Sequence, residues 1–369
     1  MERASNGQRE RLLAIDALRG FDMFWILGGE QLFAALLLLT GWQGFALAAA
    51  QMSHAQWHGF TWYDLIFPLF IFLSGVTLGL RPLSLPALPA VARRQRYRKA
   101  IKRLLLLCLL GMIYNHGWGT GMPAAPDEIR YASVLGRIGM AWFIAAMIVW
   151  HLPLKGQLWA GAGIALAYAL LQGLWPEGYS AAGSVNAWVD QRFLSGGTYQ
   201  NAPLDPEGLL SHLSAAINAL VGVWAGRWLS QPYSLWRRSA ALCGAGLLML
   251  ALGWTLDGWI PVNKILWTVT FVLVSCGWSA LLLALFLVLV DGLAWHRFGG
   301  LFALIGVNAI AIYLASALFS WDYLVSSLAG GLIAALPGSA QMVASVCALL
   351  ALQWALLWFM ARRQIFIKV

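Results

Sequence analysis

Long apolar runs constrain this chain more than any other feature of its sequence. A helix needs about 20 mostly apolar residues to cross a bilayer core, and charged or Gly/Pro-rich stretches separate runs of that length here. The expected spans are residues 20–40, 61–80, 100–116, 132–152, 157–175, 209–229, 238–256, 265–290, 299–319 and 340–361. A weaker run, 323–336, contains two adjacent glycines and ends at Pro337, which favours an interfacial or re-entrant segment. The sequence therefore predicts an all-α integral membrane protein with about ten transmembrane helices.

Composition supports this reading and narrows the partners. Apolar residues make up 60% of the chain and charged residues only 11%, whereas soluble domains carry about 25% charged residues. Lys and Arg outnumber Asp and Glu by 24 to 15, an excess that suits the lipid bilayer's anionic headgroups and anionic cytosolic ligands rather than nucleic acid. The cysteines lie inside apolar runs without the spacing of a zinc or redox motif, so we expect no metal site there.

The positions of Lys and Arg predict the orientation. With the N-terminus inside, all basic residues fall on the inner side except Arg130, Arg137, Arg192 and Lys264. An even number of spans then places both termini in the cytoplasm. We expect one domain, 1–369, in a bacterial inner membrane, with a basic cytoplasmic loop at 81–103 and a long periplasmic loop at 176–208.

The first run deserves one alternative reading, because ALAAAQ at its end resembles a signal-peptidase site. The run is as long as a full span and contains Asp22 and Glu30, which a cleaved leader does not need. We therefore expect a retained span rather than a leader.

Ionisable residues inside a membrane are candidate functional groups unless a structural partner explains them. Asp16 and Arg19 are three residues apart and share a helical face, so they can form a structural ion pair or shape a site between helices. Glu30 lies deeper in the same span. These residues are the first candidates for substrate binding.

The densest group of chemically capable side chains is in residues 53–75. A histidine beside a carboxylate can take a proton from a nucleophile or attack an acyl group itself, while the carboxylate fixes its tautomer. His54 or His58, together with Asp64, is therefore a candidate for this catalytic chemistry. Two histidines in an interfacial loop can also be structural or pH-sensing. A metal site is less favoured, because no cysteine joins them and the spacing falls in a loop.

Other polar residues on the predicted outer side are candidates for binding a hydroxyl-rich or amine-bearing ligand. They are Asn115, His116, Asp205, Glu207, Asn263 and Lys264. Asp205 followed by a proline can equally cap a helix, and loop 176–208 can be a solvated linker.

Arg137 and Asn308 lie within spans. Arg137 is a strong charge in an outer membrane half, so it needs an acidic partner or an anionic ligand. The basic loop 81–103 can attract lipid headgroups or hold the phosphates of coenzyme A.

Six motifs occur in an order that resembles the heparan-α-glucosaminide N-acetyltransferase family, including its bacterial NagX-like members. They are AIDALRG, HAQWHGFTWYDLIFPLFIFLSG, LGRIG, PLDPEGLL, VNKILW and GVNAIAIY, and the resemblance extends over nearly the whole chain, from about residue 11 to 320. The resemblance implies transfer of an acetyl group from cytosolic acetyl-CoA, as co-substrate, to the amine of a glucosamine-type sugar or glycan acceptor on the outer side.

The resemblance also implies roles for particular residues. The family's active-site histidine, in an H-x-x-W-x-G-x-T motif, falls on His54, and Trp57 matches within the same motif. His58 stands where the lysosomal enzyme has Asn, which makes it the weaker candidate. Asp64 and the pair Asn263–Lys264 also match. The family pattern leaves open whether the histidine becomes acetylated or acts as a general base.

Two other functions remain open from the sequence alone. One is an amino-sugar transporter of the inner membrane, in which outer polar residues bind a sugar without chemistry. The other is an O-acyltransferase of a cell-wall glycan. The sequence leaves the oligomeric state open as well, a homodimer included. An acetyltransferase requires a passage through the helices, because the coenzyme's nucleotide cannot dissolve in hydrocarbon.

Overall fold

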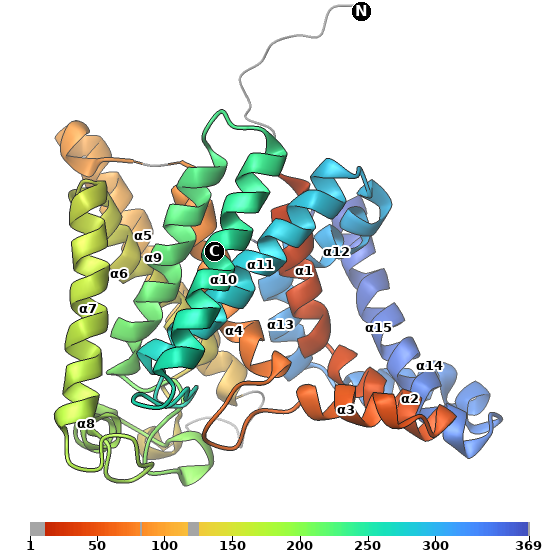
Figure 1. Ribbon diagram of the computed structural model, residues 1–369. Coiled ribbons are helices and arrows are strands. Elements are labelled where there is room, and N and C mark those ends of the chain that lie inside the picture. The colour runs from red at the N-terminus through yellow and green to blue at the C-terminus, as the bar shows by residue number, and fades with distance from the viewer. Residues whose placement is uncertain (1–11, 82, 117–124, 368–369) are drawn as a thin grey trace, which may run out of the picture.

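The computed structural model describes residues 12–81, 83–116 and 125–367 as an assembly of helices (Figure 1). Across these three ranges no strand is formed, and β-pairing is confined to an isolated bridge between Arg130 and Gly196. The prediction of an all-α integral membrane protein is confirmed at this level.

Long helices account for most of the chain. Their bounds are α1 (Leu13–Ile26), α2 (Leu32–Thr40), α3 (Gln43–Gln51), α4 (Trp62–Gly79), α5 (Ala90–His116), α6 (Val134–His151), α7 (Leu154–Leu174), α8 (Val185–Phe193), α9 (Ser211–Leu229), α10 (Leu235–Leu256), α11 (Val269–Phe286), α12 (His296–Val307), α13 (Ala309–Leu318), α14 (Trp321–Ala334) and α15 (Gly338–Arg362). Short 3₁₀ turns are η1 (Gly29–Gln31), η2 (Leu85–Ala87), η3 (Pro126–Glu128) and η4 (Tyr199–Asn201), and the π-helical turn η5 (Leu287–Gly292) extends α11.

Six helices in the described part of the chain are long and apolar enough to cross a membrane: α4, α6, α7, α10, α11 with its π turn, and α15. Two bent pairs raise the number to eight if each pair is one span. Helices α5 and α9 occupy the other two ranges expected to cross. The count of ten and the placement of the termini in the cytoplasm remain predictions.

Two expected straight spans are broken. The run 20–40 bends by 64° between α1 and α2, and the run 299–319 bends by 61° between α12 and α13. Gly28 at the first break has a φ of 122°, a conformation that a residue with a Cβ rarely adopts. The second break falls at Asn308. The apolar composition of such a run predicts that it is buried or faces lipid, but it does not predict whether the helix is straight.

The expected basic loop 81–103 is also different in the structure. Helix α5 begins at Ala90, so most of the basic residues in the range 81–103 lie on the first turns of this 27-residue helix. The straight side chains of Arg and Lys lose little freedom in a helix, which explains why this charged stretch is not a loop.

Glycines allow two helix pairs to pack at very short range. A Cβ at Gly75 on α4 would overlap the carbonyl of Ala219 on α9, and a Cβ at Gly222 on α9 would overlap the carbonyl of Phe72 on α4. The same relation joins α1 and α12, where a Cβ at Gly20 would overlap the carbonyl of Phe302. Helices without hydrophobic driving force between them associate through such close backbone contacts. These two pairs therefore fix the positions of α1 and α4.

One end of the bundle carries the polar connections. In Figure 1, α8 and the segment between α3 and α4 lie at the same end, with α2 and α3 running across it beside α14. Helix α3 has no buried residue, and Leu38, Trp42 and Leu47 are exposed. We call this the α8 end.

Gly75→Ala tests the close α4–α9 packing. We expect it to lower the free energy of unfolding by about 1–3 kcal/mol, because the added methyl group overlaps backbone that cannot move independently. Gly163→Ala on α7 is the matched control, since open space surrounds Gly163, and it should be neutral or stabilising by up to about 1 kcal/mol. Thermal unfolding of both variants in the same detergent measures the difference. Equal midpoints would contradict the packing argument.

Candidate active site

His54 and Asp64 meet at the start of α4. The Nδ1 atom of His54 lies 2.8 Å from Oδ1 of Asp64. Asp64 is in the first turn of α4 and fully buried, whereas the His54 side chain is 53% exposed. The buried carboxylate therefore orients a histidine whose other face is open to a ligand.

The second oxygen of Asp64 holds the segment that carries the histidine. Oδ2 accepts hydrogen bonds from the backbone N–H of Ala55 at 3.2 Å and of Thr61 at 3.1 Å. The Thr61 hydroxyl lies 3.0 Å from the same oxygen and 2.7 Å from the carbonyl of Ser53. Thr61 and Asp64 form a capping box, which satisfies N–H groups at the helix start that would otherwise lack partners. One carboxylate thus caps α4 and fixes both ends of the loop around His54.

Lys264 completes the cluster from a distant part of the sequence. Its Nζ lies 3.2 Å from Oδ1 of Asp64, 2.9 Å from Nδ1 of His54 and 3.3 Å from Nε2. Partial burial lowers the pKa of the Lys264 ammonium, and the charge of Asp64 opposes that shift. A cation therefore lies within hydrogen-bonding distance of both other members of the cluster.

Two hydrogen bonds position the segment that carries Lys264 beside the histidine. Gly59 donates its N–H to the carbonyl of Val262 at 2.9 Å, with a φ of 109° that favours glycine. The Asn263 side chain is fully buried, and its Oδ1 accepts from the N–H of Leu266 at 2.8 Å. Asn263 therefore shapes the turn that presents Lys264, and it does not itself join the His54 cluster.

Asp64 and Lys264 both contact Nδ1 of His54. With a proton on Nδ1, the imidazole donates a hydrogen bond to the Asp64 carboxylate, and its lone pair lies on Nε2, 3.3 Å from the Lys264 ammonium, which can only donate. That lone pair can accept a proton or attack an electrophilic carbon. Tyr63 packs beside the imidazole with ring centroids 4.7 Å apart. The sequence analysis missed Tyr63, although it directly precedes Asp64.

His58 is separated from this chemistry. Its Nε2 lies 2.8 Å from Oδ1 of Asp257, and that same oxygen accepts from the N–H of Val262 at 2.7 Å. Trp57 donates its indole N–H to the carbonyl of Tyr179 at 3.1 Å. These two residues join the His54 loop to neighbouring segments.

Arg130 is the centre of a second cluster at the α8 end. Its guanidinium donates to both oxygens of Asp205 at 2.7 Å and also to Glu207. Asp205 accepts from the N–H of Tyr199 at 2.9 Å as well. Burial alone would raise the pKa of Asp205, but the hydrogen bonds and charge of Arg130 lower it below its ordinary value.

This arrangement corrects the helix-cap interpretation of Asp205. Helix α9 begins at Ser211 and its N-cap is Leu210, so Asp205 lies five residues before the capping position. Asp190 on α8 accepts from the N–H groups of Asp205 and Leu209 instead, and burial raises the pKa of Asp190. Asp205 and Glu207 are therefore occupied in holding the long loop together.

Arg137 on α6 is fully buried without an acidic hydrogen-bond partner among the described residues. It donates to the hydroxyl of Ser211, and its guanidinium lies 4.5 Å from the ring centre of Trp267 and 5.8 Å from that of Phe67. Its Nε and one terminal nitrogen have no hydrogen-bond partner. The Arg137 guanidinium therefore packs against aromatic rings, and two of its nitrogen atoms remain able to donate hydrogen bonds.

The remaining candidates lie outside the His54 cluster. Asp16 and Arg19 pair at 3.1 Å on α1, as the sequence predicts. Glu30 lies in the turn η1 at the break after α1. Asn115 donates to the carbonyls of Arg130 and Ala132.

Two others lie at the ends of helices. His116 is the last residue of α5. Asn308 is bound to the C-terminal backbone, because its side chain donates to the carbonyl of Ile365 and accepts from the N–H of Ile367. Within the described ranges, no group of three or more His, Cys, Asp or Glu side chains is arranged to hold a metal ion.

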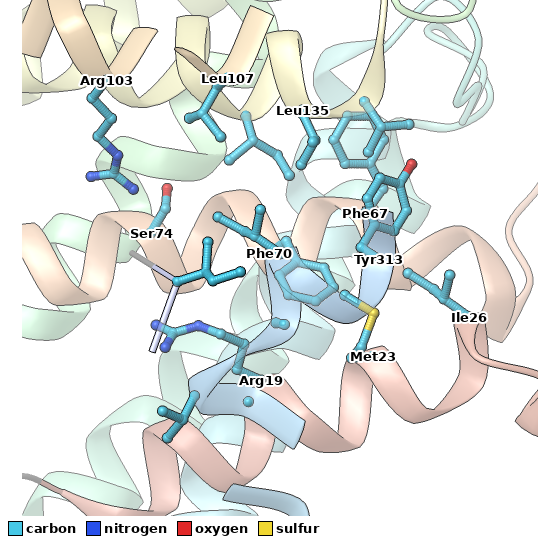
Figure 2. Close-up of a pocket in the computed structure, with 17 residues that line it drawn as sticks. Arg19, Met23, Ile26, Phe67, Phe70, Ser74, Arg103, Leu107, Leu135 and Tyr313 are labelled. Atoms are coloured by element: carbon cyan, nitrogen blue, oxygen red, sulfur yellow. The ribbon is translucent and has the colours of Figure 1, made fainter. Parts of the chain in front are cut away.

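A cavity of about 370 Å³ extends between α1, α4, α5, α6, α12 and α13 (Figure 2). Arg19 and Arg103 point into it from α1 and α5, and Tyr313, Met23 and Ile26 line another part of it. On α4 its lining begins at Phe67, three residues after Asp64. His54 is not in the lining. Sequence reasoning missed most of these residues, because they are apolar and ordinary for a membrane helix.

Comparison with known proteins gives one consistent result. The chain is 26% identical to the human heparan-alpha-glucosaminide N-acetyltransferase over 326 residues, which cover 72% of this chain and 49% of the human protein. It is 26% identical to the mouse protein of the same name over 321 residues, covering 71% of this chain and 48% of that protein. The chain therefore spans about half the length of the curated relatives it matches. No protein-family model matches it.

Arg130→Met tests whether the second cluster is structural. We expect it to lower the free energy of unfolding by about 2–3 kcal/mol near neutral pH, because it leaves Asp205 and Glu207 buried without their cation. Arg192→Met, at an exposed position on α8, is the control and should change stability by less than about 0.5 kcal/mol.

The pH dependence of this effect has a definite sign. A lowered folded-state pKa means that the contribution of Asp205 is present above its unfolded pKa of about 3.9 and is lost as the pH falls through the folded value. The difference between wild type and Arg130→Met should therefore narrow below about pH 4 in thermal unfolding. A difference that stays constant down to pH 3 would show that Asp205 is not the partner that matters.

Proposed function

We propose, from the premise that the chain is a distant relative of heparan-alpha-glucosaminide N-acetyltransferases, that it is an integral-membrane N-acetyltransferase. In this proposal it moves an acetyl group from cytosolic acetyl-CoA to the amine of a glucosamine-type sugar on the other side of a bacterial inner membrane. The observation that carries the proposal is the hydrogen-bonded cluster of His54, Asp64 and Lys264.

The reaction breaks the thioester C–S bond of the donor and forms a C–N bond to the acceptor. In one route, Nε2 of His54 accepts a proton from the sugar ammonium or from the amine as it attacks, and the coenzyme leaves as a thiol. In the other, Nε2 attacks the acetyl carbon and the C–S bond breaks to release the thiolate; the amine then takes the acetyl group from the imidazole, and the proton that the amine loses neutralises the thiolate. Both routes use a lone pair on Nε2, which the tautomer that donates from Nδ1 to Asp64 provides, so the geometry at Asp64 supports either.

Lys264 supplies the charge that either route requires. Attack on a thioester carbonyl places negative charge on its oxygen, and a fixed cation in a partly desolvated site stabilises that charge. The Nζ atom of Lys264 is 3.3 Å from Nε2 of His54, so a carbonyl that His54 can reach is also close to the ammonium. We therefore assign Lys264 to stabilising the oxyanion and Asp64 to positioning both partners.

The cavity beside Arg19 and Arg103 suits the donor. Its apolar lining matches a pantetheine arm, and guanidinium groups bind phosphates as charge-assisted hydrogen-bond donors. The Nε atom of Arg103 is buried without a hydrogen-bond partner. In this proposal the phosphates contact Arg19 and Arg103, and the arm runs along α4 toward Asp64. A movement near Tyr63 and Phe67 would then connect the cavity to His54.

His54→Ala should lower acetyl transfer to glucosamine by about a hundredfold to ten-thousandfold, because it removes the only imidazole in the cluster. His58→Ala is the matched control: it removes a histidine four residues away that is bound to Asp257, and we expect at most a severalfold loss. Radiolabelled acetyl transfer by purified protein measures both. Full transfer by His54→Ala would refute the assignment, and uptake of unmodified glucosamine without acetyl-CoA would favour a transporter instead.

Arg103→Gln should raise the KM for acetyl-CoA by about tenfold, because a charge-assisted hydrogen bond to phosphate contributes one to a few kcal/mol. The KM for acetyl-pantetheine, which lacks the nucleotide, should not change. Lys102→Gln, at an exposed neighbouring position, is the control and should alter neither value. An equal rise for both donors would mean that Arg103 shapes the cavity without contacting the nucleotide.

A further inference from the structure

A second cavity lies on the other side of α1 and α4. Its volume is about 480 Å³, and residues of α1, α2, α3, α4 and α11 line it. Apart from Asp22 and Gln51 its lining side chains are apolar or aromatic. A volume of this size falls in the range of sites that enclose small ligands.

Helices α1 and α4 form the wall between the two cavities. Each of these helices contributes residues to both cavities. Toward the second cavity α4 presents Leu65, Ile66 and Leu69, and toward the first it presents Phe67, Phe70 and Ser74. The corresponding sets on α1 are Phe21, Asp22 and Trp25, and Arg19, Met23 and Ile26. The two cavities are therefore separate compartments that share one wall.

The two ends of the segment that carries His54 lie at the second cavity. Gln51 and Met52 line it just before His54, and Trp62 lines it just before Tyr63, whose ring packs on the imidazole. Asp64 lies at the end of the shared wall. A molecule in the second cavity would thus reach His54 from the side opposite to the first cavity.

The rim of this cavity is apolar and exposed. Leu47 is 76% exposed and Trp62 is 39% exposed, and both line the cavity. They belong to α3 and to the first residue of α4, which lie at the α8 end. An apolar opening at the edge of a membrane protein admits a lipid chain without moving it through water.

Asp22 provides the second observation. Its side chain lines the cavity, only 2% of the residue is exposed, and its Oδ2 atom has no hydrogen-bond partner. A buried polar atom without a partner costs about 1–3 kcal/mol in general. Because Asp22 is buried whereas Leu47 and Trp62 are exposed, the carboxyl lies in the interior of the cavity and not at its rim. A ligand that fits it carries an O–H or N–H group part of the way along an otherwise apolar chain.

We propose that this cavity holds the chain of an amphiphilic amino-sugar acceptor, and that the Asp22 carboxyl accepts a hydrogen bond from a hydroxyl or amide group in that chain. The inference rests on the proposed function and names its acceptor class. Anchoring the chain between α3 and α4 keeps the sugar amine at the His54 loop, which raises its effective concentration there. Donor and acceptor then approach His54 from the two sides of the α1–α4 wall.

The test uses two alkyl glucosaminides that are identical except for one hydroxyl group in the middle of the chain. Each carries a photoreactive diazirine at the chain end, and the protein is studied in phosphatidylglycerol nanodiscs. We expect light to attach both compounds to residues 47–52 or 62–69, mapped by mass spectrometry. Ala48→Trp, which fills the cavity from α3, should reduce this labelling by about tenfold, because it removes the apolar surface that the chain covers. Ala50→Trp, at an exposed position on the same helix that does not line the cavity, should leave it unchanged.

Asp22→Leu tests the polar contact separately. Wild type should prefer the hydroxylated chain by about tenfold, because the hydroxyl pairs with an otherwise unpartnered buried group, and the variant should lose that preference. Labelling elsewhere, equal labelling in Ala48→Trp, or equal labelling by a diazirine fatty alcohol without sugar would overturn the proposal. A protein that labels as expected but acetylates neither glucosamine nor these compounds would contradict the proposed function while supporting the chain-binding site.

Discussion

The buried carboxylate of Asp64 is the interaction on which the rest of the site depends. Its two oxygens bind five groups: the imidazole of His54, the ammonium of Lys264, two backbone N–H groups and the Thr61 hydroxyl. A carboxylate removed from water is tolerated only when such partners surround it. Here those partners are also the elements of the site. The requirement to satisfy one buried charge therefore assembles the loop, the helix start and the candidate catalytic histidine together.

Backbone packing between helices supports that carboxylate. Gly75 and Gly222 let α4 and α9 approach until their backbones touch, and Gly20 does the same for α1 against α12. With α1 and α4 held in this way, their opposite faces line two cavities, one containing two arginines and the other a single carboxyl. The charge of each cavity differs because Arg19 lines the first cavity, whereas Asp22, three residues further along the same helix, lines the second. A single wall thus separates two environments, and Asp64 lies at the start of one of its two helices.

Similarity to two curated N-acetyltransferases and the geometry of the cluster are independent lines of support for the proposed chemistry. The similarity is distant, at 26% identity, and covers about half of each relative. The geometry adds what similarity at that level does not provide, namely which of two nearby histidines is oriented by a buried acid. Asp64 orients His54, whereas the partially exposed Asp257 binds His58. The two acids differ in burial: Asp64, which binds His54, is fully buried, whereas Asp257, which binds His58 and connects two loops, is partly exposed.

The sequence by itself determined the helical membrane class and most helix positions, because runs of apolar residues can satisfy their backbone in lipid only as helices. It also placed two histidines, His54 and His58, close to Asp64 at the start of one helix, and the motif resemblance selected His54 between them. Only the tertiary structure decided that Lys264, 210 residues from His54, joins them, and that Asp205 and Glu207 are engaged by Arg130. Those contacts depend on how separate segments pack, which no local pattern encodes. For the same reason, apolarity did not predict the bends at Gly28 and Asn308 or the two cavities. It indicates that a segment is buried or in lipid, but not the direction of the helix axis or of its side chains.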